Sequence, residues 1–298
     1  MLFTEQSYEQ HRHHYEKFFD VAQSREWFQP ETVDGWRHER MFSFIKPFLR
    51  SQKKSKWVTI GDGRYGIDSI RLKKIEPTLD VLPTDIDSFF LEKAKEQNII
   101  SDYKIENAEK LSFKDNEFDF VLCKETYHHL PRPFSAVYEM LRVASKAIVL
   151  IEPNDNLPMP FLYHWYFRLK NAVKTIIKRS AEHTDQWRFE KYGNYVHTIS
   201  RREMQKAALG LRLPVVAWKY FNDCYVHGVE KEKCASDSKF FRKIKRKISM
   251  MDLKNKLHLS SPSSIVIVLF TSMPGKEALD ALREKKFEID FLPENPFA

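Results

Sequence analysis

The sequence contains few cysteines and no long apolar run, and each shortage excludes a class of protein. Three cysteines are spread over 298 residues, too few for a disulfide framework and without the paired spacing of a zinc site. We therefore expect a reducing, cytoplasmic setting and no bound metal. The longest apolar runs, Ala147–Ile151 and Ile265–Phe270, suit buried strands, because a membrane-spanning helix needs about 20 such residues. The polar first residues predict no signal peptide.

Positive charge exceeds negative charge, giving a formal net charge of +8. Much of the excess lies in two stretches, Arg168–Arg179 and Lys231–Lys256. Such a balance is compatible with nucleic acid, a membrane surface or an anionic substrate as partner. It is equally compatible with solvated helix faces that bind nothing. A hydrophobic content of 42% predicts a substantial core.

Short apolar segments alternate with helix-prone segments from residue 56 onward. The segments that favour strands are 56–60, 79–85, 103–105, 118–123, 147–151, 214–220 and 264–270. Strands that alternate with helices at this spacing predict βαβ units and a parallel sheet, with the loop after each strand on one edge. We expect residues 1–55 to form a helical N-terminal cap and residues 56–298 one domain. Helical insertions are expected at about 154–199 and 228–261.

A glycine-rich turn and an acid follow the first two predicted strands. Gly61, Gly63 and Gly66 stand between a strand and a helix, where glycine allows a tight turn and a close approach of backbone to ligand. Asp85 ends the second strand, where a carboxylate can accept both ribose hydroxyls of an adenosine cofactor. Asp87 is better placed to cap the next helix. These features do not separate NAD from S-adenosylmethionine (SAM).

Four further segments carry a resemblance to a known family. They are NAEKLSF at 107–113, FDFVL at 118–122, YHHL at 127–130 and EMLRV at 139–143. In this order they resemble class I SAM-dependent methyltransferases of the UbiE-like, methyltransferase type 11 group. The GDGRYG turn and the CKETYHHLPRP segment at 123–133 are similar to a bacterial subgroup of it. The resemblance covers roughly residues 56–153.

The resemblance implies a fold, a cofactor and a binding site. The fold would be α/β and Rossmann-like, with a mostly parallel seven-stranded sheet, an antiparallel last strand, a helical N-terminal cap and helical insertions. The cofactor would be SAM. The residues that the family pattern implies for cofactor binding are Gly61, Asp62, Gly63, Gly66, Asp85, Ile86, Asn107, Ala108 and Lys124.

Two positions depart from the family pattern near the methionine end of the cofactor. Thr59 stands where the family usually has an acid, and Tyr65 stands where its third glycine usually falls. The missing acid could be supplied by Asp62 or by Asp34 in the N-terminal region. Asn107 replaces the usual aspartate at the adenine, and its carbonyl can still accept a hydrogen bond.

Methyl transfer requires alignment of the nucleophile, the methyl group and the sulfur, and a base if the nucleophile is a hydroxyl. The residues after the fourth and fifth strands would face the methyl group. The candidates for catalysis are His128, His129 and Glu125, with Lys124 and Glu152 beside them. Structural roles are also open: the histidines could pack the loop, and Lys124 could pair with Glu125. Arg142 is expected to form a structural ion pair.

These observations favour a SAM-dependent methyltransferase that acts on a small-molecule, sugar or lipid-linked acceptor. An RNA or protein methyltransferase is less favoured, because no N-P-P-Y or D-P-P-Y motif follows the fourth strand and no RNA-binding module is present. Nucleic acid remains a possible partner. A non-catalytic SAM-binding protein is a third alternative, given Thr59 and Tyr65. An NAD-dependent oxidoreductase is a fourth, opposed by the 107–113 segment.

Overall fold

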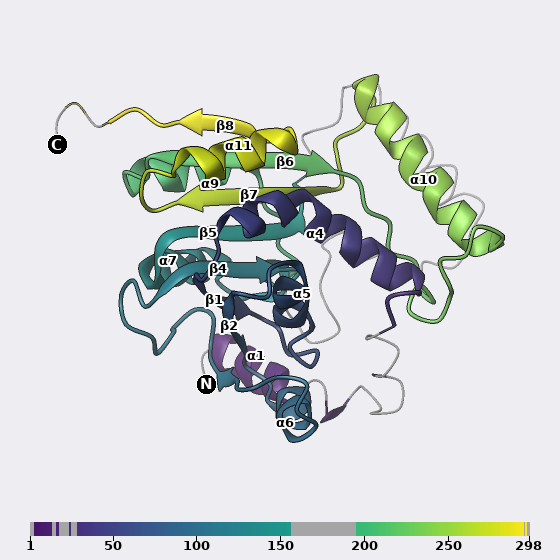
Figure 1. Ribbon diagram of the computed structural model, residues 1–298, viewed down its shortest axis with the longest axis horizontal. Coiled ribbons are helices and arrows are strands. Elements are labelled where there is room, and N and C mark those ends of the chain that lie inside the picture. Colours follow the sequence, from purple (N-terminus) through teal and green to yellow (C-terminus); the bar gives the residue numbers. More distant parts are fainter. Residues whose placement is uncertain are drawn as a thin grey trace.

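The chain builds one twisted sheet with helices on both faces. A computed structural model describes residues 3–13, 16–17, 24, 29–155, 195–294 and 296. The sheet has eight strands in the order β3-β2-β1-β4-β5-β7-β6-β8 (Figure 1). The strands are β1 Lys56–Ile60, β2 Asp80–Asp85, β3 Lys104–Ile105, β4 Phe118–Lys124, β5 Ala144–Pro153, β6 Val215–Phe221, β7 Ser264–Phe270 and β8 Glu288–Phe291.

Strand direction divides the sheet into two regions. β1 pairs in parallel with β2 and with β4, and β4 pairs in parallel with β5. β7 is antiparallel to both β5 and β6, and β8 is antiparallel to β6. The carboxyl ends of β1 to β5 therefore lie at one edge of the sheet.

Helices bury both faces of the sheet, as strands with apolar side chains on both sides require. On one face α4 Val33–Ser51, α5 Ile67–Ile75 and α11 Lys276–Glu284 pack over Trp57 and Phe120. Phe48 of α4 contacts both of these rings, with centroids 6.5 and 5.6 Å away. On the other face α7 Pro133–Val143 and α9 Arg201–Gly210 pack over Val121 and Ile148. The two helix layers hold the sheet in place, and the edge formed by the carboxyl ends of β1 to β5 lies between them.

The remaining helices lie outside these layers. They are α1 Phe3–Arg12, α6 Phe89–Glu96, the short 3₁₀ helix η2 Tyr127–His129 and α10 Lys239–Lys256. The insertion expected at 154–199 falls mostly outside the described residues, and the stretch 228–261 contains α10. Within the described ranges, no helix combines the length and the apolar character needed to cross a bilayer.

The predicted fold class is confirmed, with one strand more than expected. β7 is antiparallel as predicted, and the additional strand is β8, which lies outside the seven strand-prone segments of the sequence. β8 is short, and only Ile289 and Asp290 are half-buried in it. Its pattern of apolar residues is too weak to predict a strand. β8 forms because its backbone pairs with β6.

Candidate functional site

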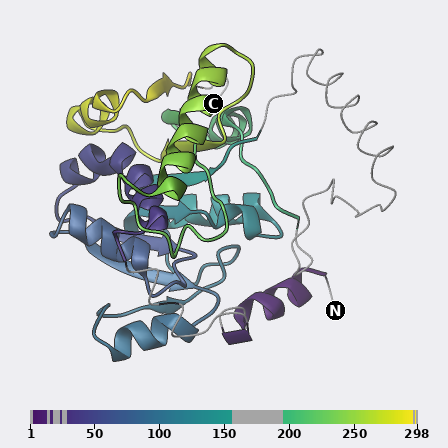
Figure 2. The ribbon, with the colours of Figure 1, turned by 90° about the vertical axis from the view of Figure 1, so that its right-hand side faces the viewer.

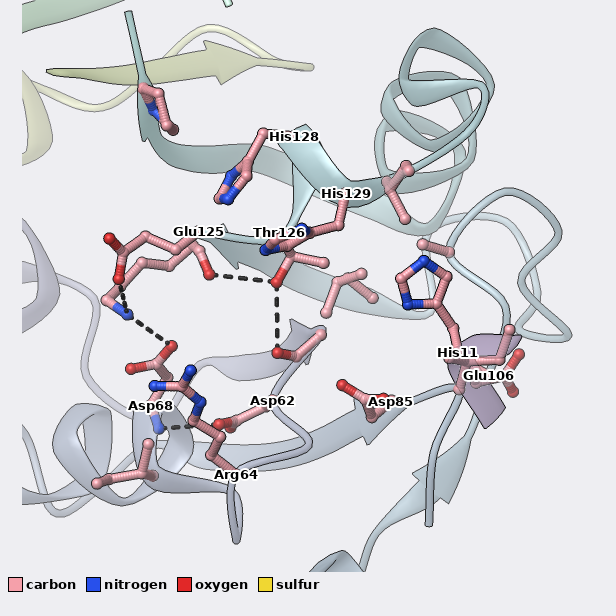
Figure 3. A pocket seen from close by; sticks show the side chains of 18 of the residues that line it. His11, Asp62, Arg64, Asp68, Asp85, Glu106, Glu125, Thr126, His128 and His129 are labelled. Carbon is pink, nitrogen blue, oxygen red and sulfur yellow. Dashed lines mark hydrogen bonds and ion pairs between the residues drawn. The ribbon is translucent and has the colours of Figure 1, made fainter. Parts of the chain in front are cut away.

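A cavity lies where the strand order reverses, between the carboxyl ends of β1 and β4. Loops on either side of such a point diverge, so ligands bind there in open α/β sheets. The cavity measures about 590 Å³ and is lined by residues from α1, α4, the loops after β1, β2, β3, β4 and β5, and Tyr225. In Figure 3, His128 and His129 lie above the cavity, Asp62 and Asp85 below it, and Asp68 and Glu125 on one side.

The turn after β1 depends on Gly61. Its φ is +75°, a conformation that favours glycine. A Cβ placed on Gly61 would lie 2.1 Å from the Thr126 Oγ1 atom. Thr126 Oγ1 also lies 3.3 Å from the carbonyl oxygen of Gly61, to which it can donate. The loops after β1 and β4 thus contact each other, and a side chain at position 61 would separate them.

Gly61→Ala is expected to lower the free energy of unfolding by about 2–4 kcal/mol, because it combines a left-handed backbone with overpacking against Thr126. The urea midpoint of the purified variant measures the effect. Gly210→Ala is the matched control, since nothing lies within 4 Å of the added Cβ there. A Gly61→Ala protein as stable as wild type would show that the two loops are not in contact.

Asp62 stabilises the start of α5. Its carboxylate accepts hydrogen bonds from the N–H groups of Asp68 (3.0 Å) and Ser69 (2.9 Å) and from the Thr59 hydroxyl (2.8 Å). Burial, and then the charge of Asp68, raise the pKa of Asp62 to about 6. Thr59, which stands in place of the usual acid, is therefore a hydrogen-bond donor to Asp62. Asp62 lines the cavity but uses its acceptors within the protein.

Asp85 is held in place by two backbone groups. Its Oδ2 accepts from Gly63 N–H and its Oδ1 from Asp87 N–H, both at 2.8 Å. Burial raises the pKa of Asp85 to about 7. Each carboxylate oxygen has a further lone pair, and the side chain lines the cavity. Asp87 accepts from the Phe89 N–H at the start of α6, so the contact expected of Asp87 with the next helix is observed.

The loop after β3 forms the wall next to Asp85. Ile86, Asn107 and Ala108 all line the cavity, and the Asn107 Oδ1 atom accepts from the Glu109 N–H at 3.0 Å. The N-terminal helix α1 reaches this wall through Tyr8, whose hydroxyl donates to Glu109 Oε2 at 2.6 Å. Residues far apart in the sequence thus close one end of the cavity.

Opposite charges meet at the end of β4. Lys124 Nζ is buried and lies 3.3 Å from Asp68 Oδ2 and 3.4 Å from Glu125 Oε2. The predicted pairing of Lys124 with Glu125 is therefore observed, and Asp68 is an additional partner. Burial alone would raise the pKa of Glu125, but the positive charges of Lys124 and Arg37 outweigh it and hold that pKa well below its usual range.

The start of α4 extends this charged cluster. Arg37 is buried, lies 2.7 Å from Asp34 Oδ1, and forms an ion pair with Asp223 beyond β6. His38 is buried beside Asp34, and its Nδ1 has no hydrogen-bond partner within the described residues. Burial lowers the pKa of His38. Asp34 therefore lines the cavity as an ion-pair partner of Arg37.

Sequence reasoning missed several residues of this cluster. Cavity-lining polar residues to which it gave no role include Tyr8, His11, Asp68, Arg71, Thr126 and Tyr225. Asp68 had one available signal, because it stands two residues after Gly66, in the first turn of the helix that begins at the glycine turn. Tyr225 had none, since it reaches the cavity only through the packing of the segment after β6.

His128 forms a pair with a buried acid. Its Nδ1 lies 2.7 Å from the Oε2 atom of Glu152, whose side chain is fully buried at the end of β5. The Oε1 atom of Glu152 accepts from the N–H groups of Thr126 (2.8 Å) and Tyr127 (2.9 Å). A carboxylate only accepts hydrogen bonds, so Nδ1 of His128 is the donor in this pair. His129 lies beside it, with ring centroids 3.9 Å apart.

Most of the predicted site residues line this one cavity. They are Gly61, Asp62, Asp85, Ile86, Asn107, Ala108, Lys124, Glu125, His128 and His129. Gly63 and Gly66 do not line it. Gly63 orients Asp85, and Gly66 has a φ of +67° at the start of α5. Arg142 forms ion pairs with Glu139 and Asp115, as predicted.

Comparison with known proteins places a methyltransferase domain on this part of the chain. Residues 59–151 match a family model described as a methyltransferase domain. This match begins in β1 and ends in β5, so it contains the glycine turn, Asp85 and the histidine pair. No curated protein matches the chain.

Several solved structures share the fold. A phosphoethanolamine N-methyltransferase 2 from Haemonchus contortus is 11% identical, with a TM-score of 0.50 over 79% of this chain and 53% of that one. A SAM-dependent methyltransferase from Thermotoga maritima is 15% identical (TM-score 0.45), covering 88% of this chain and 99% of that one. A protein from Bacillus halodurans described as a putative methyltransferase is 15% identical (TM-score 0.46), covering 79% of this chain and 100% of that one.

The domain match confirms two predictions from the sequence. The enzyme class is that of a SAM-dependent methyltransferase, and the cofactor is SAM. The acceptor and the roles of individual residues remain to be assigned.

Proposed function

We propose that this protein transfers the methyl group of SAM to a hydroxyl group of a small-molecule, sugar or lipid-linked acceptor, as a member of the UbiE-like group. The observation that carries the proposal is the single cavity of about 590 Å³. It joins an acid suited to ribose with a histidine suited to removing a proton. Its size is typical of sites for small molecules and cofactors.

The residues at the Asp85 end of the cavity fit an adenosine. Asp85 has lone pairs left for the two ribose hydroxyls, because each of its oxygens accepts only one backbone N–H. Ile86 and Ala108 offer apolar surface to the adenine, and Asn107 offers a polar edge. Gly61 lets the backbone approach the ribose and the methionine closely.

The charged cluster fits the methionine end of the cofactor, which carries one ammonium and one carboxylate. Lys124 and Arg37 would attract the carboxylate, and Asp68 and Glu125 the ammonium. His38 brings a buried nitrogen without a hydrogen-bond partner among the described residues, and an unsatisfied buried polar atom costs free energy until it finds a partner. Other members of the family usually have an acid at the position of Thr59, near the methionine end of the cofactor. In this protein the residues of the charged cluster would take its place.

His128 would act as the general base. When bound, SAM provides a methyl group already activated by the sulfonium. The Nε2 atom of His128 accepts the hydroxyl proton as the oxygen attacks, and Glu152 stabilises the imidazolium that forms. The ring of His129 lies next to that of His128, with the two planes tilted by 42°, and Glu125 joins the charged cluster to the loop that carries both histidines. The pair of His128 and Glu152 therefore suits an acceptor atom that loses a proton when it is methylated.

Mass spectrometry of the purified protein tests the cofactor, with SAM or S-adenosylhomocysteine expected to co-purify. Incubation with [methyl-¹³C]SAM and fractions of a cell extract then tests the acceptor, and the ¹³C chemical shift separates O-methyl from N-methyl products. Label in RNA or protein fractions would favour those acceptors instead. Cofactor binding without any transfer would indicate a non-catalytic SAM-binding protein, and stabilisation by NADH alone an oxidoreductase.

A further inference from the structure

The helix α10 carries a dense positive charge that the protein does not neutralise. Eight of its 18 residues are Lys or Arg, and one, Asp252, is acidic. The eight cations are Lys239, Arg242, Lys243, Lys245, Arg246, Lys247, Lys254 and Lys256, and all are exposed. In the part of the chain that the structure describes, none of them pairs with a carboxylate. Repulsion between these cations destabilises the helix. Their charge therefore does not serve the fold, and it indicates a binding partner.

The same helix exposes large apolar side chains that a solvated surface helix does not need. Met250, Leu253 and Leu257 are 52, 56 and 58% exposed. Their spacing of three and four residues places them on one face. That face lies opposite the buried side chains of Phe241 and Ile248, which attach the helix to the protein. The outward face is thus basic toward its start and apolar toward its end.

The position of α10 links this surface to the active cavity. Phe241, Ile244 and Ile248 pack against Val33 of α4 and Cys224 of the segment after β6. These two neighbours adjoin Asp34 and Tyr225, which line the cavity. In Figure 1, α10 lies on the side to which the arrowheads of β4 and β6 point, and in Figure 2 it lies on the outside of the molecule.

We propose that α10 docks the protein onto an anionic lipid surface. Basic side chains are attracted to anionic headgroups, and apolar side chains next to them enter the boundary between headgroups and acyl chains. The apolar face selects lipid over nucleic acid, because phosphate contacts require only the cations. This inference does not depend on the acceptor.

Vesicle co-sedimentation of the full-length protein tests the charge. We expect binding to phosphatidylcholine vesicles that contain about a quarter phosphatidylglycerol, and little binding to phosphatidylcholine alone. The triple variant Arg242→Glu, Lys243→Glu, Arg246→Glu is expected to lower the partition coefficient more than about tenfold. Three reversals away from α10, Arg202→Glu, Lys206→Glu and Lys276→Glu, serve as the matched control and should change it far less.

A second variant tests the apolar face without altering charge. Met250→Ser, Leu253→Ser and Leu257→Ser together are expected to weaken binding to the same vesicles about tenfold or more, because lost burial of three side chains removes the insertion step. Leu209→Ser, Leu211→Ser and Met273→Ser are equally exposed positions elsewhere and should have little effect. All six positions are on the surface, and unchanged circular dichroism checks that the variants fold.

Each result decides the proposal. Loss of vesicle binding in both α10 variants, with both controls intact, supports it. Absence of binding to anionic vesicles, or binding that both α10 variants retain, overturns it. Binding to transfer RNA that the serine variant retains, without binding to vesicles, would assign the surface to nucleic acid instead.

Discussion

Replacing His128 with glutamine is expected to lower the turnover number by about 10²–10⁴-fold, the usual contribution of a positioned general base. The affinity for SAM should stay within about twofold, because the change removes an interaction made in the transition state and leaves the cofactor contacts in place. Glutamine keeps a polar side chain of similar length next to Glu152, so the loop after β4 should retain its conformation.

Glu152 provides the sharper test of the same pair. Its Oε2 atom accepts a hydrogen bond from Nδ1 of His128, while its Oε1 atom accepts from the Thr126 and Tyr127 N–H groups. In Glu152→Gln the amide would donate to Nδ1, which moves the proton to Nε2, the nitrogen that has to act as base. Turnover should therefore fall by an amount comparable to that in His128→Gln, although residue 152 does not touch the acceptor.

Steady-state kinetics with the acceptor found in the extract screen, combined with calorimetry for SAM, measure both effects. His129→Gln is the matched control, because its ring lies next to that of His128 in the same loop. A greater loss in His129→Gln would assign the base to His129. Normal turnover in both His128→Gln and Glu152→Gln would indicate an acceptor that needs no base, and would contradict a hydroxyl acceptor.

Asp85→Ala is expected to weaken SAM binding by about 1–3 kcal/mol, the scale for hydrogen bonds to a charged group. This corresponds to about 5- to 150-fold in the dissociation constant. The physical reason is that the carboxylate would accept both ribose hydroxyls. Calorimetry measures the change. An unchanged affinity would show that the ribose is held elsewhere.

The raised pKa of Asp85 adds a pH dependence with a definite sign. Burial raises this pKa to about 7, whereas an exposed aspartate titrates near 4. The protonated form accepts hydrogen bonds less well, so SAM binding should strengthen as the pH rises through 7. From about pH 8 to pH 6 the affinity is expected to fall about tenfold. In Asp85→Asn this dependence should be lost, and its persistence there would assign it to another group, such as Asp62.

The same shift has the opposite sign for the stability of the unliganded protein. Because the folded state binds this proton more tightly than the unfolded chain, the contribution of Asp85 to stability is fully present below pH 4 and is lost as the pH rises toward 7. Binding of SAM would offset that loss at neutral pH. Asp85 thus lowers the stability of the unliganded protein at neutral pH, at a position where bound SAM would restore that stability.

The sequence by itself determined the parallel core and the part of the site that follows directly from it. Gly61, Asp85 and Asn107 each come after a strand that the sequence predicts. The carboxyl ends of parallel strands share one edge, so the three positions had to converge. Local patterns decide such features, and little else in the chain can alter them.

Only the tertiary structure decided the charged cluster, the contact between His128 and Glu152, and the last strand. Arg37 and Asp223 are 186 positions apart, and His128 and Glu152 are 24 apart. Their contacts depend on how α4, the segment after β6 and two neighbouring strands pack, which no local pattern records. β8 likewise exists because β6 offers unpaired backbone groups. The sequence shows which side chains are present. Ion pairs and the pairing of an edge strand, however, arise from packing between distant segments.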